Sequence, residues 1–126
     1  MKQAEIPNVC TIQYYPEDKI LLINYTQKLI VDADLVQKVV DKAMELVGDE
    51  KFKLIIDVRN VIYLTKQARE LTATLQKDRI LAFSPVLKDN IHKELFNLFL
   101  NFSKPSYPTK AFLTVEQAMK WMKSFD

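Results

Sequence analysis

Asp57 is the acidic residue whose position in the sequence best suits chemistry. It follows the apolar residues 54–56 and is expected near the carboxyl end of a buried central strand, where open α/β sheets place their ligand sites. Arg59 and Arg69 follow it closely. Two interpretations remain open. Asp57 could bind a small polar ligand, or it could accept backbone amides and pair with an arginine to fix the turn.

The sequence contains few other groups that could support catalysis. A serine or cysteine nucleophile needs a base, and the only histidine, His92, is expected on or near a helix surface. Ser84 lacks the glycine-flanked turn of hydrolases. Phosphate-binding loops need several glycines, whereas Gly48 is the only one. The single cysteine, Cys10, excludes an internal disulfide and a cysteine zinc site. We therefore expect no catalytic residue, cofactor or metal ion.

The composition is typical of one globular domain. The chain has 126 residues, of which 48% are hydrophobic and 27% are charged, and this length is enough to bury a core. The longest uninterrupted apolar run, residues 20–23, is far shorter than the roughly 20 residues of a membrane-spanning helix. Residues 1–9 lack the apolar segment of a signal peptide, and an unpaired cysteine fits a reducing compartment. We expect one domain over residues 1–126, located in the cytoplasm, without an integral membrane segment.

Charge is unevenly distributed along the chain. Residues 1–50 contain 5 lysines and 9 acidic residues, a net charge of −4, whereas residues 51–126 contain 13 basic and 7 acidic residues, a net charge of +6. Either these are solvated surfaces on different sides of one fold, or the second part forms a basic face for an acidic partner. The basic residues occur singly and in no reading motif, so we do not expect nucleic acid to bind.

The first half of the chain predicts a β-hairpin, a helix and a buried strand. Residues 9–15 alternate in polarity, residues 16–18 form a turn, and residues 19–25 form a more apolar strand. Asp32 is suited to cap a helix over residues 34–47, in which apolar residues recur every three or four positions. Gly48 suits the end of that helix, and residues 52–58 follow as a strand covered on both faces.

The second half repeats the strand and helix unit. Thr65 is expected to cap a helix, residues 79–86 to form a strand, and residues 89–102 to form a third helix. A strand over residues 109–113 and a helix capped by Thr114 complete the chain. The predicted order is ββαβαβαβα. It favours an α/β fold with a mixed, mostly parallel sheet, an N-terminal antiparallel hairpin and four helices.

Three segments resemble the SpoIIAA-like superfamily, which includes the STAS domains of anti-sigma factor antagonists and sulfate transporters. They are KLIIDVRNVIYLTKQAREL, RILAFSPV and TKAFLTVEQAMKWMKSF. The resemblance implies a SpoIIAA-like (STAS-like) fold and a bacterial, non-enzymatic module that acts in regulation through a protein partner. The related CRAL-TRIO lipid-transfer domain implies an alternative, a carrier or sensor of a lipid or another apolar small molecule.

The resemblance also indicates a candidate switch. In STAS domains, an Asp-Ser-Ser/Thr-Gly segment at the start of the helix after the central strand carries the phosphorylated residue. Here the segment is Thr65-Lys66-Gln67-Ala68, so a threonine replaces the aspartate and a lysine replaces the phosphorylated residue. Thr65 is therefore either a plain N-cap or a residue that can still be phosphorylated, since a helix N-terminus beside Lys66 tolerates a phosphate. The candidate partner or switch surface comprises Asp57, Arg59, Thr65, Lys66 and Arg69.

The third predicted helix is apolar on two sides. Its core stripe is expected to comprise Ile91, Leu95, Leu98, Phe99 and Phe102. Phe96 and Leu100 fall on the opposite side, where contiguous exposed apolar groups would be unusual for a monomer. They could form a homodimer contact or the wall of a pocket for an apolar ligand. Alternatively, the loop over residues 104–108 buries the helix, with Tyr107 packing over it.

Overall fold

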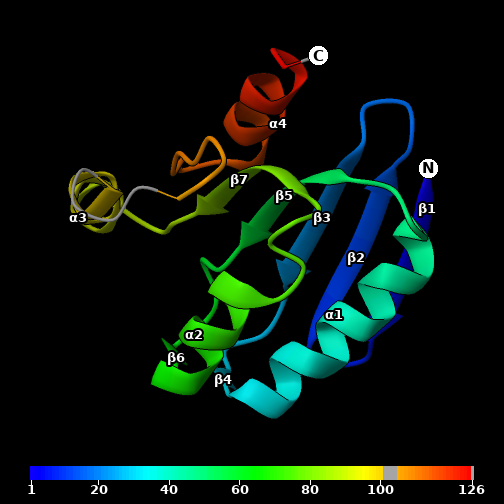
Figure 1. Ribbon diagram of the computed structural model, residues 1–126. Helices are drawn as coiled ribbons and strands as arrows, with labels where there is room; N and C mark the ends of the chain where they lie inside the picture. Colours follow the sequence, from blue (N-terminus) through cyan, green and yellow to red (C-terminus); the bar gives the residue numbers. More distant parts are fainter. Residues whose placement is uncertain (101–104, 126) are drawn as a thin grey trace.

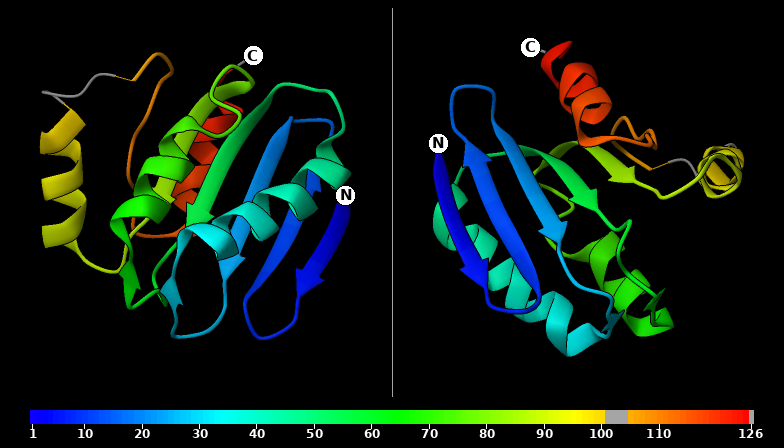
Figure 2. Two further views of the ribbon diagram at one scale, coloured as in Figure 1. Left: turned by 60° about the horizontal axis from the view of Figure 1, so that its bottom comes forward. Right: turned by 180° about the vertical axis from the view of Figure 1, so that it is seen from behind.

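The protein is built on a five-stranded sheet in the order β1-β2-β3-β5-β7 (Figure 1). The computed structural model describes residues 1–100 and 105–125, without the side chains of residues 95 and 97–100. Helices α1 (Ala33–Val47) and α2 (Lys66–Thr74) cover one face of the sheet, and α4 (Val115–Lys123) covers the other (Figure 2). The layers are thus helix, sheet and helix, and the predicted mixed α/β architecture is confirmed.

The N-terminal part of the sheet is antiparallel. Strands β2 (Cys10–Tyr15) and β3 (Ile20–Tyr25) form the predicted hairpin. Strand β1 (Lys2–Ile6), which was not predicted, pairs with β2 and forms the edge of the sheet. Its residues are mostly exposed, so it has no buried apolar pattern that could be recognised in the sequence. Backbone pairing with β2 is what makes it a strand.

The C-terminal part of the sheet is parallel, with β5 (Phe52–Asp57) between β3 and β7 (Ile80–Val86). Helix α1 has the predicted caps: the Asp32 side chain accepts the Leu35 amide at 2.9 Å, and Gly48 has φ +70°. That left-handed backbone favours glycine. The remaining small sheet joins β4 (Ile30–Val31) to β6 (Tyr63–Leu64) in parallel and was not predicted, because two-residue strands have no detectable pattern.

The predicted strand over residues 109–113 is wrong, and Pro85 explains why. Residues 109–112 run parallel to β7 but form only two isolated bridges, Phe83 with Thr109 and Val86 with Phe112. The register is constant between the bridges, so the nitrogen of Pro85 lies opposite the carbonyl of Lys110. Because proline has no amide hydrogen, this ladder bond cannot form. The segment follows the strand direction without forming a continuous strand.

The last two helices differ in their packing. Helix α4 begins after Thr114, whose side chain accepts the Gln117 amide at 3.1 Å, and buries Ala118 and Met122 against the sheet. Helix α3 (Asn90–Leu100) lies beyond the β7 edge (Figures 1 and 2). Ile91, which was expected in the core stripe of α3, is 72% exposed, so that prediction is wrong at this position. No helix in the described ranges is long and apolar enough to cross a membrane.

Candidate functional site

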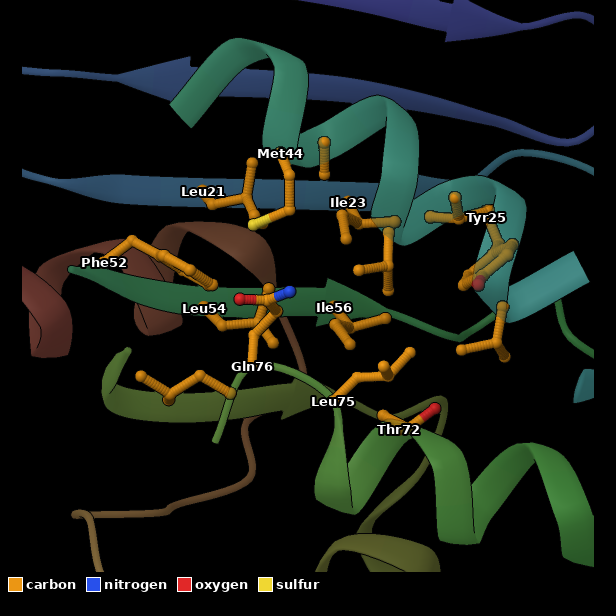
Figure 3. A pocket seen from close by; sticks show the side chains of 15 residues that line it. Leu21, Ile23, Tyr25, Met44, Phe52, Leu54, Ile56, Thr72, Leu75 and Gln76 are labelled. Atoms are coloured by element: carbon orange, nitrogen blue, oxygen red, sulfur yellow. The ribbon is translucent and has the colours of Figure 1, made fainter. Parts of the chain in front are cut away.

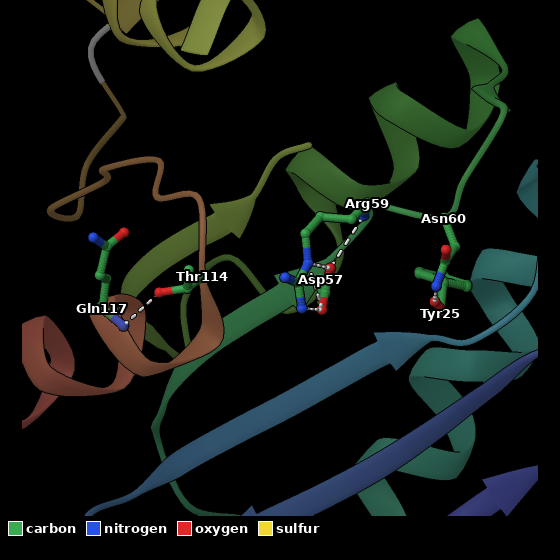
Figure 4. A network of polar contacts seen from close by, with 6 residues as sticks. All are labelled: Tyr25, Asp57, Arg59, Asn60, Thr114 and Gln117. Carbon is green, nitrogen blue, oxygen red and sulfur yellow. Dashed lines mark hydrogen bonds and ion pairs between the residues drawn. The ribbon is translucent and has the colours of Figure 1, made fainter. Parts of the chain in front are cut away.

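The carboxylate of Asp57 is buried at the end of β5 and is held by Arg59 (Figure 4). Arg59 Nη2 lies 2.7 Å from Asp57 Oδ2, Arg59 Nε lies 3.0 Å from Oδ1, and the Arg59 amide donates to Oδ1 at 3.1 Å. One residue therefore supplies both a guanidinium and a backbone amide to the carboxylate. This geometry is that of a carboxylate fixing a turn, the second interpretation considered for Asp57.

The charge of Glu116, in the first turn of α4, acts on Arg59. Hydrogen bonding to Asp57 raises the pKa of the Arg59 guanidinium, and the negative charges of Asp57 and Glu116 act in the same direction against its partial burial. Its side chain is still 41% exposed. On the other side, Asn60 Nδ2 donates to the Tyr25 carbonyl at 3.3 Å (Figure 4). The turn after β5 is thus tied to both β3 and its own strand.

Lys53 is a buried cation at the opposite end of β5, and the sequence analysis did not single it out. It is 4% exposed, and its Nζ donates to the carbonyls of Met122 at 2.9 Å and Phe125 at 3.0 Å. Carbonyls at a helix C-terminus lack intrahelical partners and carry partial negative charge. Lys53 therefore caps α4. The available signal was a lysine between Phe52 and the apolar residues 54–56 of β5.

The span from Lys53 to Asp57 in strand β5 is about as long as the helix that packs on it. Side chains alternate along a strand, and Lys53, Ile55 and Asp57 belong to the face covered by α4. Four residues of strand span about 13 Å, and nine residues of helix span about the same distance. Lys53 thus lies at the C-terminal end of α4, and Asp57 lies toward the end where α4 begins. Each charge has the sign that suits the nearby end of the helix dipole.

Thr65, Lys66 and Arg69 lie together at the start of α2. Thr65 Oγ1 accepts the Ala68 amide at 3.1 Å, so Thr65 is an N-cap. Lys66 is exposed, and Arg69 Nη1 donates to the Leu64 carbonyl at 2.6 Å. The Arg69 guanidinium also lies 5.8 Å from the centre of the Tyr63 ring, within the range of a cation–π contact.

The structure separates the five predicted surface residues into two groups. In the described part of the chain, neither Asp57 nor Arg59 forms a hydrogen bond or ion pair with Thr65, Lys66 or Arg69. Residues 58–62 lie between the groups along the chain. The pair at the end of β5 faces α4, whereas α2 lies on the other face of the sheet. The five residues of the predicted partner or switch surface therefore lie at two or more separate places on the protein.

Three large apolar side chains are exposed beside the second group, and the sequence analysis missed them. Ile30, Ile62 and Tyr63 are 62%, 66% and 53% exposed. Ile30 pairs with Tyr63 in the small β4–β6 sheet, and the Ile62 amide donates to the Leu29 carbonyl at 2.8 Å. We define the β4–β6 patch as Ile30, Ile62, Tyr63, Lys66 and Arg69. No local pattern indicated it, because it depends on two segments far apart in the sequence.

An apolar cavity lies between α1, α2 and the sheet (Figure 3). Met44 from α1, Leu75 and Gln76 after α2, and Leu54 and Ile56 from β5 line it. Its volume is about 40 Å³. A water molecule in the liquid occupies about 30 Å³, and small-molecule pockets measure about 300–1,000 Å³. The cavity is a small packing void on this scale.

The predicted apolar surface on α3 is described only in part. Phe96 is half-buried, while the side chain of Leu100 lies outside the described part of the structure. Tyr107 is half-buried and packs against the core beneath α1 and α2.

His92 is exposed, and its Nδ1 lies 2.7 Å from Asp89 Oδ1, which also accepts the His92 amide. These hydrogen bonds lower the pKa of Asp89.

Two further groups considered for chemistry lie in the core. Ser84 is fully buried, and its hydroxyl has no hydrogen-bond partner within the described residues. Burial also raises the pKa of Cys10 to about 11. A nucleophile needs access to substrate and a deprotonating partner, and neither side chain has these features in this structure. Among residues 1–100 and 105–125, no three metal-ligating side chains lie close enough to hold a metal ion.

Comparisons with known proteins agree with this architecture. The structure superposes on that of an uncharacterized protein of the DUF3478 family with a SpoIIAA-like fold, from Shewanella loihica PV-4. The TM-score is 0.67 and the identity 11%, over 97% of this chain and 99% of that chain. The predicted SpoIIAA-like fold is therefore confirmed. No curated protein matches the sequence. Residues 14–126 match the model of a domain of unknown function, DUF7793, and the chain belongs to this family.

Proposed function

We propose that this protein is a non-enzymatic interaction module with a regulatory role, and that a protein partner binds its β4–β6 patch. The observation that carries the proposal is the joint exposure of Ile30 and Tyr63 on the small sheet and of Ile62 next to it. Exposed apolar groups that are contiguous and bordered by polar residues are typical of interaction sites. The patch therefore has an apolar centre suited to burial by a partner.

The border of the patch specifies the chemistry of the partner. Lys66 and Arg69 are exposed, and within the described residues neither pairs with a carboxylate. Arg69 already lies over Tyr63, and exclusion of water would strengthen this contact. Arginine and tyrosine are also the residue types that contribute most at interfaces. The expected partner presents apolar side chains together with Asp or Glu.

Thr65 is the candidate switch of this surface. It precedes Lys66 at the N-terminus of α2, where backbone amides and the helix dipole favour an anion. A phosphate there would add about −1.5 to −2 charges beside the basic border of the patch. Phosphorylation would consequently weaken binding of an acidic partner. The Asp57–Arg59 pair is not part of the binding surface in this proposal. It stabilises the turn that leads to the patch.

The carrier alternative receives less support from the geometry. A lipid or another apolar ligand needs an apolar cavity of several hundred Å³. The apolar cavity between α1 and α2 measures about 40 Å³, and the larger open groove beside α4 is lined by three lysines. An interaction module requires no cavity.

We place the action of the protein in the cytoplasm, and the unpaired, buried Cys10 supports a reducing compartment.

The test compares three proteins as bait in extracts of the native host: the wild type, the double variant Ile62→Ser/Tyr63→Ser, and Ile91→Ser. Ile91 is a matched control because it is also exposed, but on α3. We expect the wild type and the control to retain the same acidic protein and the patch variant to lose it. Calorimetry with the purified partner should then show at least about tenfold weaker binding by the patch variant. Equal retention by all three baits would refute the proposal.

A further inference from the structure

A second surface feature is an open groove between α3 and α4. Its volume is about 390 Å³, which falls in the range of small-molecule sites. Residues from α3, from residues 110–112 and from α4 line it. The side chains that matter here are Lys93, Lys110, Phe112, Gln117, Lys120 and Trp121. The groove is separate from the β4–β6 patch, because it involves neither β4 nor β6.

The groove is cationic. Three lysines contribute to its lining, and among the described residues no carboxylate does. Lys93 lies 3.7 Å from the exposed Glu94, whereas Lys110 and Lys120 form no ion pair within the described residues. Lysine ammonium groups act as point charges for anions. Three such groups lining one open groove favour a negatively charged ligand.

One wall of the groove is aromatic. The rings of Phe112 and Trp121 have their centres 5.8 Å apart, and Phe125 packs edge-on against Trp121 at 4.9 Å. These contacts hold the Trp121 ring in place. Lys110 Nζ lies 5.4 Å from the centre of the Phe112 ring, so charge and aromatic surface occur together. Gln117 adds an amide that can both donate and accept hydrogen bonds.

We infer that this groove binds a small organic anion with a flat apolar body, such as an aromatic carboxylate. The lysines attract the negative group, and Phe112 and Trp121 provide the surface for the flat part. A ligand that used only the lysines or only the aromatic wall would not account for both features occurring in one groove. A fully apolar ligand would leave the ammonium groups without a counterion, and a simple inorganic anion would not use the aromatic wall. This site is independent of the protein partner proposed for the β4–β6 patch.

Trp121 provides a direct readout because it is the only tryptophan in the sequence. Its single indole N–H signal can be followed in ¹H–¹⁵N spectra during titration with 2-naphthoate. The matched probes are 2-naphthalenemethanol, which has the ring without the charge, and acetate, which has the charge without the ring. We expect a saturable shift of the indole signal with 2-naphthoate and at least about tenfold weaker binding of each matched probe.

Charge reversal separates this site from general attraction to a basic protein. The variant Lys110→Glu/Lys120→Glu should weaken 2-naphthoate binding at least about tenfold, because two attractive charges become repulsive. The control Lys28→Glu/Lys38→Glu changes the net charge equally at exposed positions outside the groove and should bind like the wild type. Equal weakening by both variants would show non-specific attraction and overturn the inference, as would an unshifted indole signal.

A measurement on the wild type covers the case in which the charge-reversed variant does not fold. Iodide and caesium quench exposed tryptophan fluorescence and carry opposite charges. Because Trp121 and three lysines line the same groove, the quenching constant of iodide should exceed that of caesium severalfold at equal ionic strength. Equal constants would mean that the indole is not in a cationic groove, and the inference would fail.

Discussion

Lys53 donates from its Nζ atom to the carbonyl oxygen of Met122 over 2.9 Å, joining the start of β5 to the end of α4. The Lys53→Met variant should lower the free energy of unfolding by about 1–3 kcal/mol, because it removes two hydrogen bonds from a buried ammonium group to carbonyls at the end of α4. Urea unfolding measures this difference. Lys51→Met, an exposed lysine on the same segment, should change stability by less than about 0.5 kcal/mol. If the free energy of unfolding falls by the same small amount in both variants, the hydrogen bonds of Lys53 to the end of α4 do not stabilise the protein.

The Asp57–Arg59 pair predicts non-additive mutational effects. Arg59→Ala leaves the buried carboxylate with the backbone amide alone and should cost about 1–3 kcal/mol. In an Asp57→Ala background the same change should cost less than about 0.5 kcal/mol, since the carboxylate is gone. A double-mutant cycle by urea unfolding gives the coupling. Strictly additive costs would show that the pair does not hold the turn.

Thr65 should contribute to stability as an N-cap whether or not it is ever modified. Its hydroxyl oxygen accepts the Ala68 amide at 3.1 Å. Thr65→Ala should therefore cost about 1 kcal/mol, whereas Thr65→Ser should be nearly neutral because serine caps equally well. Thermal unfolding of the two variants provides the comparison. A neutral alanine variant would contradict the capping role.

Self-association through Phe96 and Leu100 remains a prediction. The double variant Phe96→Glu/Leu100→Glu should keep the far-ultraviolet circular dichroism of the wild type and reduce the molar mass from dimer to monomer in light scattering. Ile91→Glu, at an exposed position on the same helix, should keep the dimer mass. A wild type that is already monomeric, or a double variant of unchanged mass, would rule out this dimer contact.

Cys10 should make the stability of the protein fall as the pH rises in the alkaline range. Burial raises the thiol pKa from 9.0 to about 11, so the folded state binds more protons than the unfolded state between these values, and stability falls as pH rises. Between pH 8 and pH 10 the loss should be about 1 kcal/mol. Urea unfolding of the wild type and Cys10→Ala at both pH values provides the test. The variant should lose less, and equal losses would assign the effect to other groups.

The elements that could be predicted from the sequence are those with local signals. The caps Asp32, Gly48, Thr65 and Thr114 mark helix ends within a few residues of the apolar period that they bound. Strand β5 was likewise recognisable as an apolar run. Strand β1 and the β4–β6 sheet were not, because their residues become strands only through pairing with distant segments.

The candidate site was predictable only in part for the same reason. Asp57 and its pairing with an arginine followed from their closeness in sequence, and Arg59 lies two residues away. The failed strand at residues 109–113 shows the limit, since its own residues suit a strand and the missing amide belongs to Pro85 on the neighbouring strand. Whether residues 109–113 form a strand was decided by a proline in β7 and not by their own sequence.

The sequence by itself determined the α/β class, most helix boundaries and the SpoIIAA-like order of elements, because apolar periodicity and capping act over a few residues. Only the tertiary structure decided which side chains meet. Lys53 reaches a carbonyl 69 residues away, Ile30 is exposed beside Tyr63, and lysines from three separate segments line the same groove as Trp121. These contacts depend on how sheet and helices pack, and packing is a property of the whole chain.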